Sequence, residues 1–192
     1  MELKGPVFLM QPIPYFGEKL KGVWFVEPKI DGWRLQIIKY KDGHVEFWGR
    51  RLEKKPNWTE SLKYLNRSLK FLPEGTLLDC ELYSDKGRRG IPSVIKRTNK
   101  ASPLIFVFDV VYYKNKYIGK LPLKERKMIL KTFRWKEPFF LLEYKRLKNL
   151  EESLKEASEK EFEGIVIKEV NSPYLISKDG PIATHYWRKV KY

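Results

Sequence analysis

Short apolar runs that end at glycine, proline or charged residues predict β-strands along much of the chain. Valine, isoleucine, leucine and aromatic residues dominate these runs, and such residues favour extended backbone. Strands are expected over residues 23–26, 35–40, 45–48, 76–83, 104–113, 164–170 and 186–190. A tight turn at Asp42-Gly43 is expected to join the second and third of them.

Helical spacing marks the segments between these strands. Leucines recur at positions 62, 65, 69 and 72, which predicts a helix with Thr59 as its N-cap and residues 73–75 as its stop. Further helices are expected over residues 91–96 and 123–132. Asn149 and Glu152 resemble a capping box that opens a helix ending near Lys160. The mixture is an α+β pattern dominated by sheets, without the regular alternation or glycine-rich phosphate loop of a Rossmann or P-loop domain.

Length and composition are those of one packed domain. The chain has 192 residues, of which 42% are hydrophobic and 15% aromatic, and it contains no repeat or Gly/Ser linker. We therefore expect a single domain over residues 1–192. The longest strongly apolar run, residues 104–111, contains Asp109 and is far shorter than the roughly 20 residues that span a bilayer. The N-terminus lacks the apolar stretch of a signal peptide, so we expect a cytoplasmic protein without a membrane partner.

Charge and metal-ligand content narrow the function classes. Lys and Arg number 39 against 24 Asp and Glu, a formal net charge of +15, which favours a polyanionic partner such as nucleic acid. A generally basic surface is the alternative. The single cysteine, Cys80, excludes an internal disulfide, and two histidines are too few for a zinc cluster. Any metal would be a hard cation held by carboxylates. We interpret Cys80 as a buried residue that packs in the core rather than as a reactive thiol.

Residues 27–34, Glu-Pro-Lys-Ile-Asp-Gly-Trp-Arg, place Lys29 among an acid, a glycine and an arginine. Taken alone, this run is better explained as a hairpin turn at Asp31-Gly32 with Lys29 as a solvated charge. Four further motifs change that interpretation. They are Leu-Asp-Cys-Glu at 78–81, Phe-Val-Phe-Asp at 106–109, Glu-Gly-Ile-Val-Ile-Lys at 163–168 and Trp-Arg-Lys-Val-Lys at 187–191.

Together the five motifs resemble the covalent nucleotidyltransferase superfamily, and among its branches the ATP-dependent DNA ligases. The resemblance runs from about Pro12 to Lys191, with the motifs in the family order. It implies the α+β nucleotidyltransferase fold of a DNA ligase catalytic core, with twisted antiparallel sheets flanked by helices and the nucleotide between the sheets. It also implies ATP and Mg²⁺ as cofactors and nicked duplex DNA as substrate. Lys29 would become covalently adenylylated, AMP would pass to the 5′-phosphate of a nick, and a 3′-hydroxyl would seal the strand.

The chemistry requires an unprotonated amine that attacks the α-phosphate of ATP. Nearby cations make an amine easier to deprotonate, so Lys189, Lys191 and a bound Mg²⁺ would both activate Lys29 and neutralise the phosphate. The resemblance therefore makes these three lysines the candidate catalytic residues. The alternative for Lys189 and Lys191 is that they form the solvated face of a terminal strand.

Two glutamates are candidate metal ligands because each lies at or within an apolar strand, where an unpaired carboxylate is costly. The resemblance assigns Glu81 to the ribose and the metal, and Glu163 to the metal near the α-phosphate. Mg²⁺ is commonly held by one or two carboxylates together with phosphates. The alternative is that each glutamate caps a strand at the surface.

The resemblance assigns the remaining candidates to nucleotide binding. Phe108 would stack on adenine, although it alternates with Phe106 in the manner of core residues. Glu27 would lie near the adenine amino group. The other candidates are Asp31 of the Lys-x-Asp-Gly core, Arg34 and Arg50 at the nucleotide or nick phosphate, and Lys168 at the phosphates. The family usually has a small hydroxyl residue before the arginine at position 50, where this chain has Gly49, and a glycine where it has Cys80.

The same motifs leave three other interpretations open. RNA ligases and capping guanylyltransferases share the Lys-x-Asp-Gly core, although Arg34 and the last two motifs favour a DNA ligase. A non-catalytic nucleic-acid-binding module would need the positive surface, including the basic loop at 86–89 that we expect to touch phosphates, but not the carboxylates.

Ligases of this type normally continue into an OB-fold domain, and the sequence stops at Tyr192. The chain is then a minimal enzyme, a protein whose partner supplies that function, or a fragment.

Overall fold

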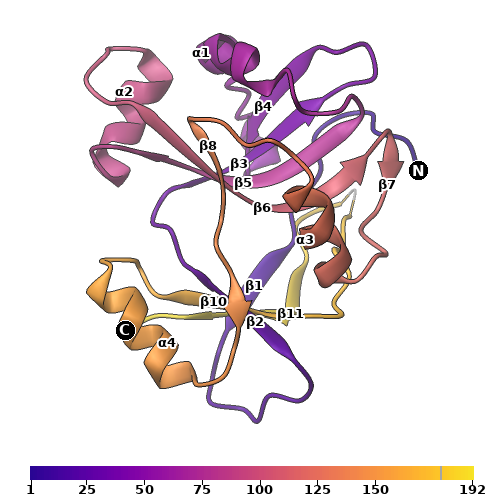
Figure 1. Cartoon of the computed structure of the whole chain (residues 1–192). Coiled ribbons are helices and arrows are strands. Elements are labelled where there is room, and N and C mark those ends of the chain that lie inside the picture. Colours follow the sequence, from indigo (N-terminus) through magenta and orange to yellow (C-terminus); the bar gives the residue numbers. More distant parts are fainter. Residues whose placement is uncertain (178) are drawn as a thin grey trace.

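Two β-sheets lie one above the other and form the frame of the molecule (Figure 1). The computed structural model describes residues 1–177 and 179–192. The upper sheet has the order β4-β3-β5-β6-β7, with β8 also paired to β6, and its strands are β3 Trp33–Lys39, β4 Val45–Gly49, β5 Thr76–Ser84, β6 Pro103–Tyr113, β7 Lys116–Tyr117 and β8 Phe139–Leu141. The lower sheet has the order β1-β11-β10-β2-β9, built from β1 Gln11–Pro14, β2 Trp24–Pro28, β9 Lys145–Arg146, β10 Ile165–Glu169 and β11 Ala183–Val190.

Most neighbouring strands are antiparallel, but each sheet contains one parallel pair. These are β1 with β11 and β6 with β8. The expected antiparallel sheets are therefore confirmed, with one parallel pair added at the edge of each. β1 could not be found from periodicity, because two of its four residues are prolines, which are tolerated at a sheet edge. β7, β8 and β9 are only two or three residues long and were also missed.

Side chains from the upper sheet supply two apolar layers. Along β3, Leu35 and Ile37 pack into the outer core beneath the helices, whereas Ile38 faces the core between the sheets. Trp187 of β11 enters the same inter-sheet core from below. This alternation follows from the two-residue repeat of an extended strand. It explains why the strands of the upper sheet are apolar on both faces.

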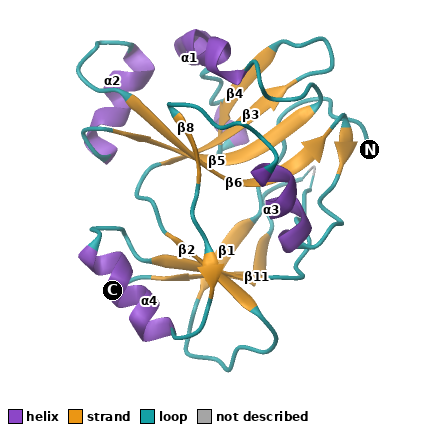
Figure 2. Cartoon of the chain, in the orientation of Figure 1, coloured by secondary structure: helices purple, strands orange, loops and turns teal. Residues whose placement is uncertain are grey.

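Helices α1 Thr59–Leu62, α2 Ile91–Lys96 and α4 Leu150–Glu159 cover the outer faces of the sheets, whereas α3 Leu123–Lys131 lies at their side (Figure 2). α1 continues as a 3-10 helix, Lys63–Leu69, and with α2 it lies over the upper sheet. α3 packs beside β6, and α4 lies against the lower sheet. Asn149 caps α4 by accepting a hydrogen bond from the Glu152 N–H, as the capping box predicted.

One local expectation is wrong, and one alternative interpretation is excluded. The N-cap of α1 is Trp58, and the Thr59 hydroxyl instead accepts from the Phe47 N–H, so tertiary contact replaces the predicted cap. Asp31-Gly32 is not a hairpin turn, because β2 and β3 lie in different sheets and residues 29–32 cross from one sheet to the other. The crossing places Lys29 at the mouth of the space between the sheets.

None of the helices over residues 1–177 and 179–192 has the length and apolar character needed to cross a membrane.

Candidate active site

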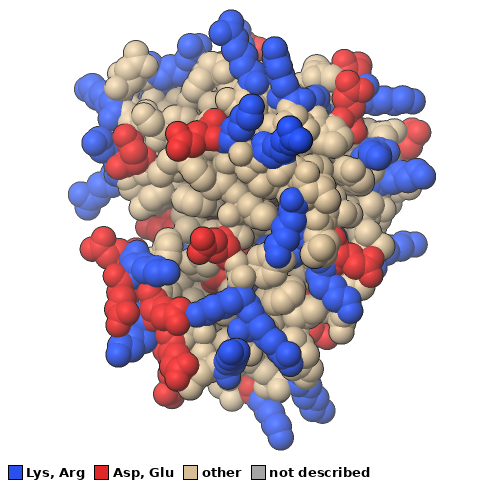
Figure 3. Space-filling model, viewed as in Figure 1, with Lys and Arg blue, Asp and Glu red and all other residues tan. Residues whose placement is uncertain are grey.

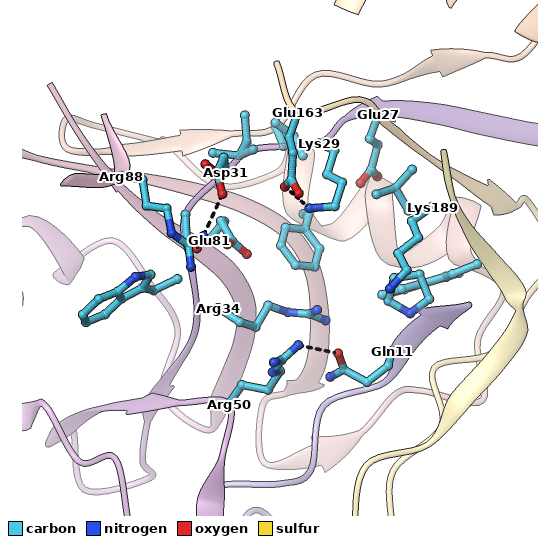
Figure 4. Close-up of a pocket in the computed structure, with 18 of the residues that line it drawn as sticks. Gln11, Glu27, Lys29, Asp31, Arg34, Arg50, Glu81, Arg88, Glu163 and Lys189 are labelled. Carbon is cyan, nitrogen blue, oxygen red and sulfur yellow. Dashed lines mark hydrogen bonds and ion pairs between the residues drawn. The ribbon is translucent and has the colours of Figure 1, made fainter. Parts of the chain in front are cut away.

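A cavity of about 890 Å³ opens between the two sheets, and both sheets contribute to its walls (Figure 4). All eleven residues proposed from the sequence line it: Glu27, Lys29, Asp31, Arg34, Arg50, Glu81, Phe108, Glu163, Lys168, Lys189 and Lys191. These residues are spread over 165 positions of the sequence, from position 27 to position 191. The fold thus brings the five motifs to one place.

Lys29 follows β2 and is held at the cavity by its own backbone. Its N–H donates to the Gly164 carbonyl at 2.9 Å, and its carbonyl accepts from the Glu163 N–H at 3.0 Å. Gly164 has a φ of +142°, and a Cβ there would collide with the Val190 carbonyl. A side chain at position 164 would therefore force β10 and β11 apart, beside Lys29.

Glu163 is the charge partner of two lysines from different elements. Its carboxylate forms an ion pair with the Lys29 ammonium through one oxygen and with the Lys191 ammonium through the other. Burial raises the pKa of Glu163, but the two lysines outweigh it, and the pKa is lowered overall. The strand period of β11 places Lys189 on the cavity side, where it lies across from Lys29 in Figure 4.

Glu81, by contrast, has no ion pair or side-chain hydrogen bond among the described residues. Burial raises its pKa to about 7, although Arg34, Lys29 and Arg50 act against the rise. Gly32 allows the approach, since a Cβ at that position would meet the Leu82 carbonyl and come within 2.8 Å of Glu81 Cγ. An unpaired carboxylate in a basic cavity is suited to accept a cation or a hydroxyl donor.

Arg34 is committed to a buried contact rather than left free. Its guanidinium makes a two-point pair with Asp79, Nε–Oδ1 at 2.5 Å and Nη2–Oδ2 at 2.6 Å, and the Tyr174 hydroxyl donates to the same carboxylate at 2.5 Å. The guanidinium carbon lies 4.8 Å from the centroid of the Phe108 ring. Arg50 is freer, with one hydrogen bond to Gln11 Oε1 at 3.3 Å.

Phe108 occupies a β-bulge. In the register of β5 with β6, Cys80 faces Val107 and Asp79 faces Asp109, so Phe108 is the extra residue. A bulge redirects the side chain that it carries. Phe108 turns into the space between the sheets, where its ring and that of Trp187 pack in a T-shaped arrangement at a centroid distance of 6.4 Å.

Behind Phe108 lies a buried triad of charges. Glu27, 2% exposed, forms ion pairs with Lys127 through Oε1 and with Lys168 through Oε2, the latter at 2.7 Å. Lys168 Nζ also lies 4.4 Å from the centroid of the Phe108 ring and 4.0 Å from that of Trp187. Burial lowers the pKa of Lys168 to about 8. Lys168 thus contacts Glu27 and two aromatic rings, and its placement at the phosphates stays a prediction.

Residues 9–191 match the family described as ATP dependent DNA ligase domain. The chain belongs to this family. The DNA ligase-like protein LigB of the SPbeta prophage in Bacillus subtilis (strain 168) is 32% identical over 174 residues, which cover 87% of this chain and 60% of LigB. A DNA ligase of Methanococcus aeolicus is 29% identical over 167 residues, 77% of this chain and 29% of that protein.

Solved structures of DNA ligases share the fold of this ligase domain. Mycobacterial DNA ligase D complexed with ATP and MES has a TM-score of 0.73 at 19% identity, covering 96% of this chain and 60% of that chain. The Chlorella virus DNA ligase-adenylate has a TM-score of 0.61 at 20% identity, covering 96% and 69%. The chain spans less than two thirds of the length of the curated relatives named above.

The sequence motifs missed several residues that shape the site of this ligase domain. Arg88, expected only in a phosphate-contacting loop, lines the cavity and pairs with Asp31 at 2.7 Å. Lys127 was assigned only to a helix. Asp79, although inside a motif, was given no role, and its pair with Arg34 spans 45 residues. Neither Lys127 nor Asp79 has a local pattern that could have revealed its distant partner.

Proposed function

We propose that this domain is the catalytic core of a DNA ligase that uses ATP to seal nicks in duplex DNA. One observation carries the proposal. The Lys29 ammonium forms an ion pair with the Glu163 carboxylate, which also pairs with Lys191. Lys189 lines the same cavity. In one cavity, these groups would supply a nucleophilic amine, cations that neutralise phosphate, and an acidic ligand. A non-catalytic binding module would not need the carboxylates.

The reaction proceeds by three displacements at phosphorus. The Lys29 amine attacks the α-phosphorus of ATP, so that a P–N bond forms, pyrophosphate leaves and the amine loses its proton. An oxygen of the 5′-phosphate at a nick then attacks the AMP phosphorus and the P–N bond breaks. The 3′-hydroxyl attacks the activated 5′-phosphate, AMP leaves and the new phosphodiester closes the strand. Such in-line steps depend mainly on positioning and charge neutralisation.

The cavity is lined by residues of different chemistry, which supports a mode of nucleotide binding. Phe108 and Glu27 both line it, so an adenine stacked on the ring would place its amino group near an acceptor. Lys29, Lys189 and Lys191 line the same cavity and would neutralise the phosphates. Glu81 would accept from the ribose hydroxyls.

The carboxylates fit Mg²⁺ bound together with phosphates. Over residues 1–177 and 179–192 no three or more His, Cys, Asp or Glu side chains are grouped as a metal cage. Mg²⁺ commonly binds through one or two carboxylates and substrate phosphates, so Glu81 and Glu163 would be its protein ligands. Bound there, the ion would neutralise the charge that develops on the phosphate oxygens.

The first prediction is that incubation with ATP and Mg²⁺ adds one AMP to the protein at Lys29. Intact mass spectrometry measures the addition and peptide mapping locates it, with GTP as the comparison nucleotide. Lys29→Ala should abolish the addition. Lys29→Arg should also abolish it, because a guanidinium stays protonated and cannot attack phosphorus.

Lys41→Ala is the matched control, because Lys41 is an exposed lysine on a turn, and it should be adenylylated normally. An AMP adduct on Lys29→Ala would show that another residue is the nucleophile. A panel of nicked DNA and nicked RNA substrates then decides the substrate class.

A further inference from the structure

Lys127 is a buried cation that no step of the proposed reaction uses. It lies on α3 with an exposed fraction of 0% and does not line the cavity. Its ammonium pairs with Glu27 Oε1 and donates to the carbonyl oxygen of Phe108 at 2.7 Å. The ammonium also lies 4.8 Å from the centroid of the Tyr144 ring. A single side chain thus joins the carboxylate and the aromatic residue of one cavity wall from behind.

Anchoring α3 does not require this charge. Leu123 and Leu130 of the same helix are fully buried, and Arg126 makes a two-point pair with Asp109 at 2.8 and 3.0 Å. An apolar side chain of similar length would fill the site of Lys127 without the cost of desolvating an ammonium. The cation therefore has a use other than packing.

Its two contacts set the geometry of that wall. At the bulge, Phe108 has no register partner on β5, and Lys127 supplies a donor to its carbonyl. Lys127 and Lys168 each pair with one oxygen of Glu27, so the carboxylate cannot rotate freely. An ionised carboxylate accepts hydrogen bonds and cannot donate them.

We propose that Lys127 is a positioning residue for purine selection, fixing the Glu27 acceptor and the Phe108 ring in one arrangement. The inference rests on the proposed function for the orientation of the base. Adenine presents an amino donor at its six-position, and guanine presents a carbonyl acceptor at the same place. The fixed carboxylate oxygens accept from the first and repel the second, so selectivity depends on how firmly the carboxylate is held.

Equilibrium binding tests this without turnover. The Lys29→Ala chain is titrated by calorimetry with ATP, GTP and purine riboside triphosphate, which lacks the six-amino group. Adding Lys127→Met should weaken ATP binding by about tenfold to a hundredfold, the effect of losing one charge-assisted hydrogen bond. GTP and purine riboside triphosphate should lose much less, so the ATP-to-GTP ratio falls.

Three further variants separate positioning from folding. Lys124→Met removes an exposed lysine from the same helix and should leave the ratio unchanged. Lys127→Arg keeps the charge and should retain most of the selectivity. If the methionine variant does not fold, Lys127→Gln, which keeps a donor but not the charge, should lower the ratio in the same direction.

Coupling to Glu27 supplies the last arm. In a Glu27→Gln background the ratio should already be low, and Lys127→Met should change it by less than about twofold, because residues that act as one unit are not additive. A folded Lys127→Met or Lys127→Gln chain whose ratio matches the parent would overturn the proposal. Failure of AMP addition to wild-type Lys29 would instead count against the proposed function, since the binding ratio is measured independently of that step.

Discussion

At the residue scale, burial and pairing give two carboxylates of the same cavity opposite properties. Glu163 is paired with Lys29 and Lys191, and its pKa is lowered. Glu81 has no such partner among residues 1–177 and 179–192, and burial raises its pKa to about 7. A bound cation or ribose hydroxyl would supply that interaction. This is the pattern of a functional site that costs stability.

The second prediction concerns Glu81→Gln. The pKa in the folded state, about 7, lies above the ordinary value of 4.5, so between those values the folded chain holds a proton that the unfolded chain has lost. This contribution therefore makes wild-type stability fall as pH rises from about 4.5 to 7, and the loss persists above 7. Glutamine does not ionise, so Tm at pH 8 should rise by at least about 2–4 °C, the effect of about 1 kcal/mol in a domain of this size.

Melting curves of both proteins at pH 5 and pH 8 check this, with the exposed Glu53→Gln as control. The gain in Tm should be small at pH 5. Lys168, whose pKa is about 8, contributes equally to both proteins, so subtracting the wild-type Tm from that of Glu81→Gln removes its effect. AMP addition by Glu81→Gln should fall at both pH values. A Tm gain of equal size at pH 5 would mean that ionisation of Glu81 is not the cause.

At the element scale, periodicity predicted the strands and helices that are long and regular, and it failed where contact between distant segments decides the structure. α2 was predicted at its observed bounds, Ile91–Lys96, and the Asn149 cap was predicted correctly. The crossing at Asp31-Gly32 has the composition of a hairpin turn. Only the assignment of β2 and β3 to different sheets distinguishes this crossing from such a turn. The bulge at Phe108 is also invisible locally, because it depends on the register with β5.

Candidate site residues could be named from the sequence because the motifs are short and ordered, and the fold gathers them into one cavity. Their individual roles stay predictions. The supporting layer could not be named, because Asp79, Lys127 and Arg126 act through partners far away in the sequence. A buried charge on an amphipathic helix looks like any surface lysine until its burial is known.

The third prediction tests the close approach of the crossing segment to β5. Gly32→Ala should reduce AMP addition to Lys29 by about tenfold or more, since displacement of reacting groups by 1 Å can cost about a hundredfold. The added Cβ would meet the Leu82 carbonyl, which belongs to the backbone and cannot swing aside. It would also press on Glu81. Gly5→Ala is the matched control, because no atom lies within 4 Å of a Cβ there.

Both variants are compared by single-turnover AMP addition and by thermal melting. Gly32→Ala should also lower Tm, and Gly5→Ala should change neither quantity measurably. Wild-type rates in a folded Gly32→Ala chain would show that β5 can retreat without disturbing Lys29 or Glu81.

At the scale of the whole molecule, charge is distributed unevenly over the surface. Figure 3 shows acidic side chains gathered at the lower left over α4, whereas Lys and Arg are scattered over the rest of the visible face among fewer acidic side chains. With a net charge of +15, this surface favours association with a polyanion. The basic residues also extend to the cavity, where Arg51, Lys54 and Arg88 line the wall. A duplex that lies across the cavity would contact both the basic outer surface and these basic residues of the wall.

The last prediction is that binding of nicked duplex DNA depends steeply on salt and does not require the nucleophile. Each neutralised phosphate contributes about −0.9 to the slope of log K against log salt, so five contacts give about −4.5. Affinity should then fall by about 500-fold between 50 and 200 mM salt. Fluorescence anisotropy on the Lys29→Ala chain measures the slope without adenylylation.

Reversing the exposed Lys86 and Arg89 to Glu should make the slope shallower by about 2 if both touch phosphates, while leaving the Arg88 pair with Asp31 intact. Reversal of the exposed Lys41 and Lys114 is the matched control for net charge. An equal change in slope for both pairs would assign the effect to total charge and remove the loop from the interface, and a slope near zero in the parent would exclude a phosphate-contacting surface altogether.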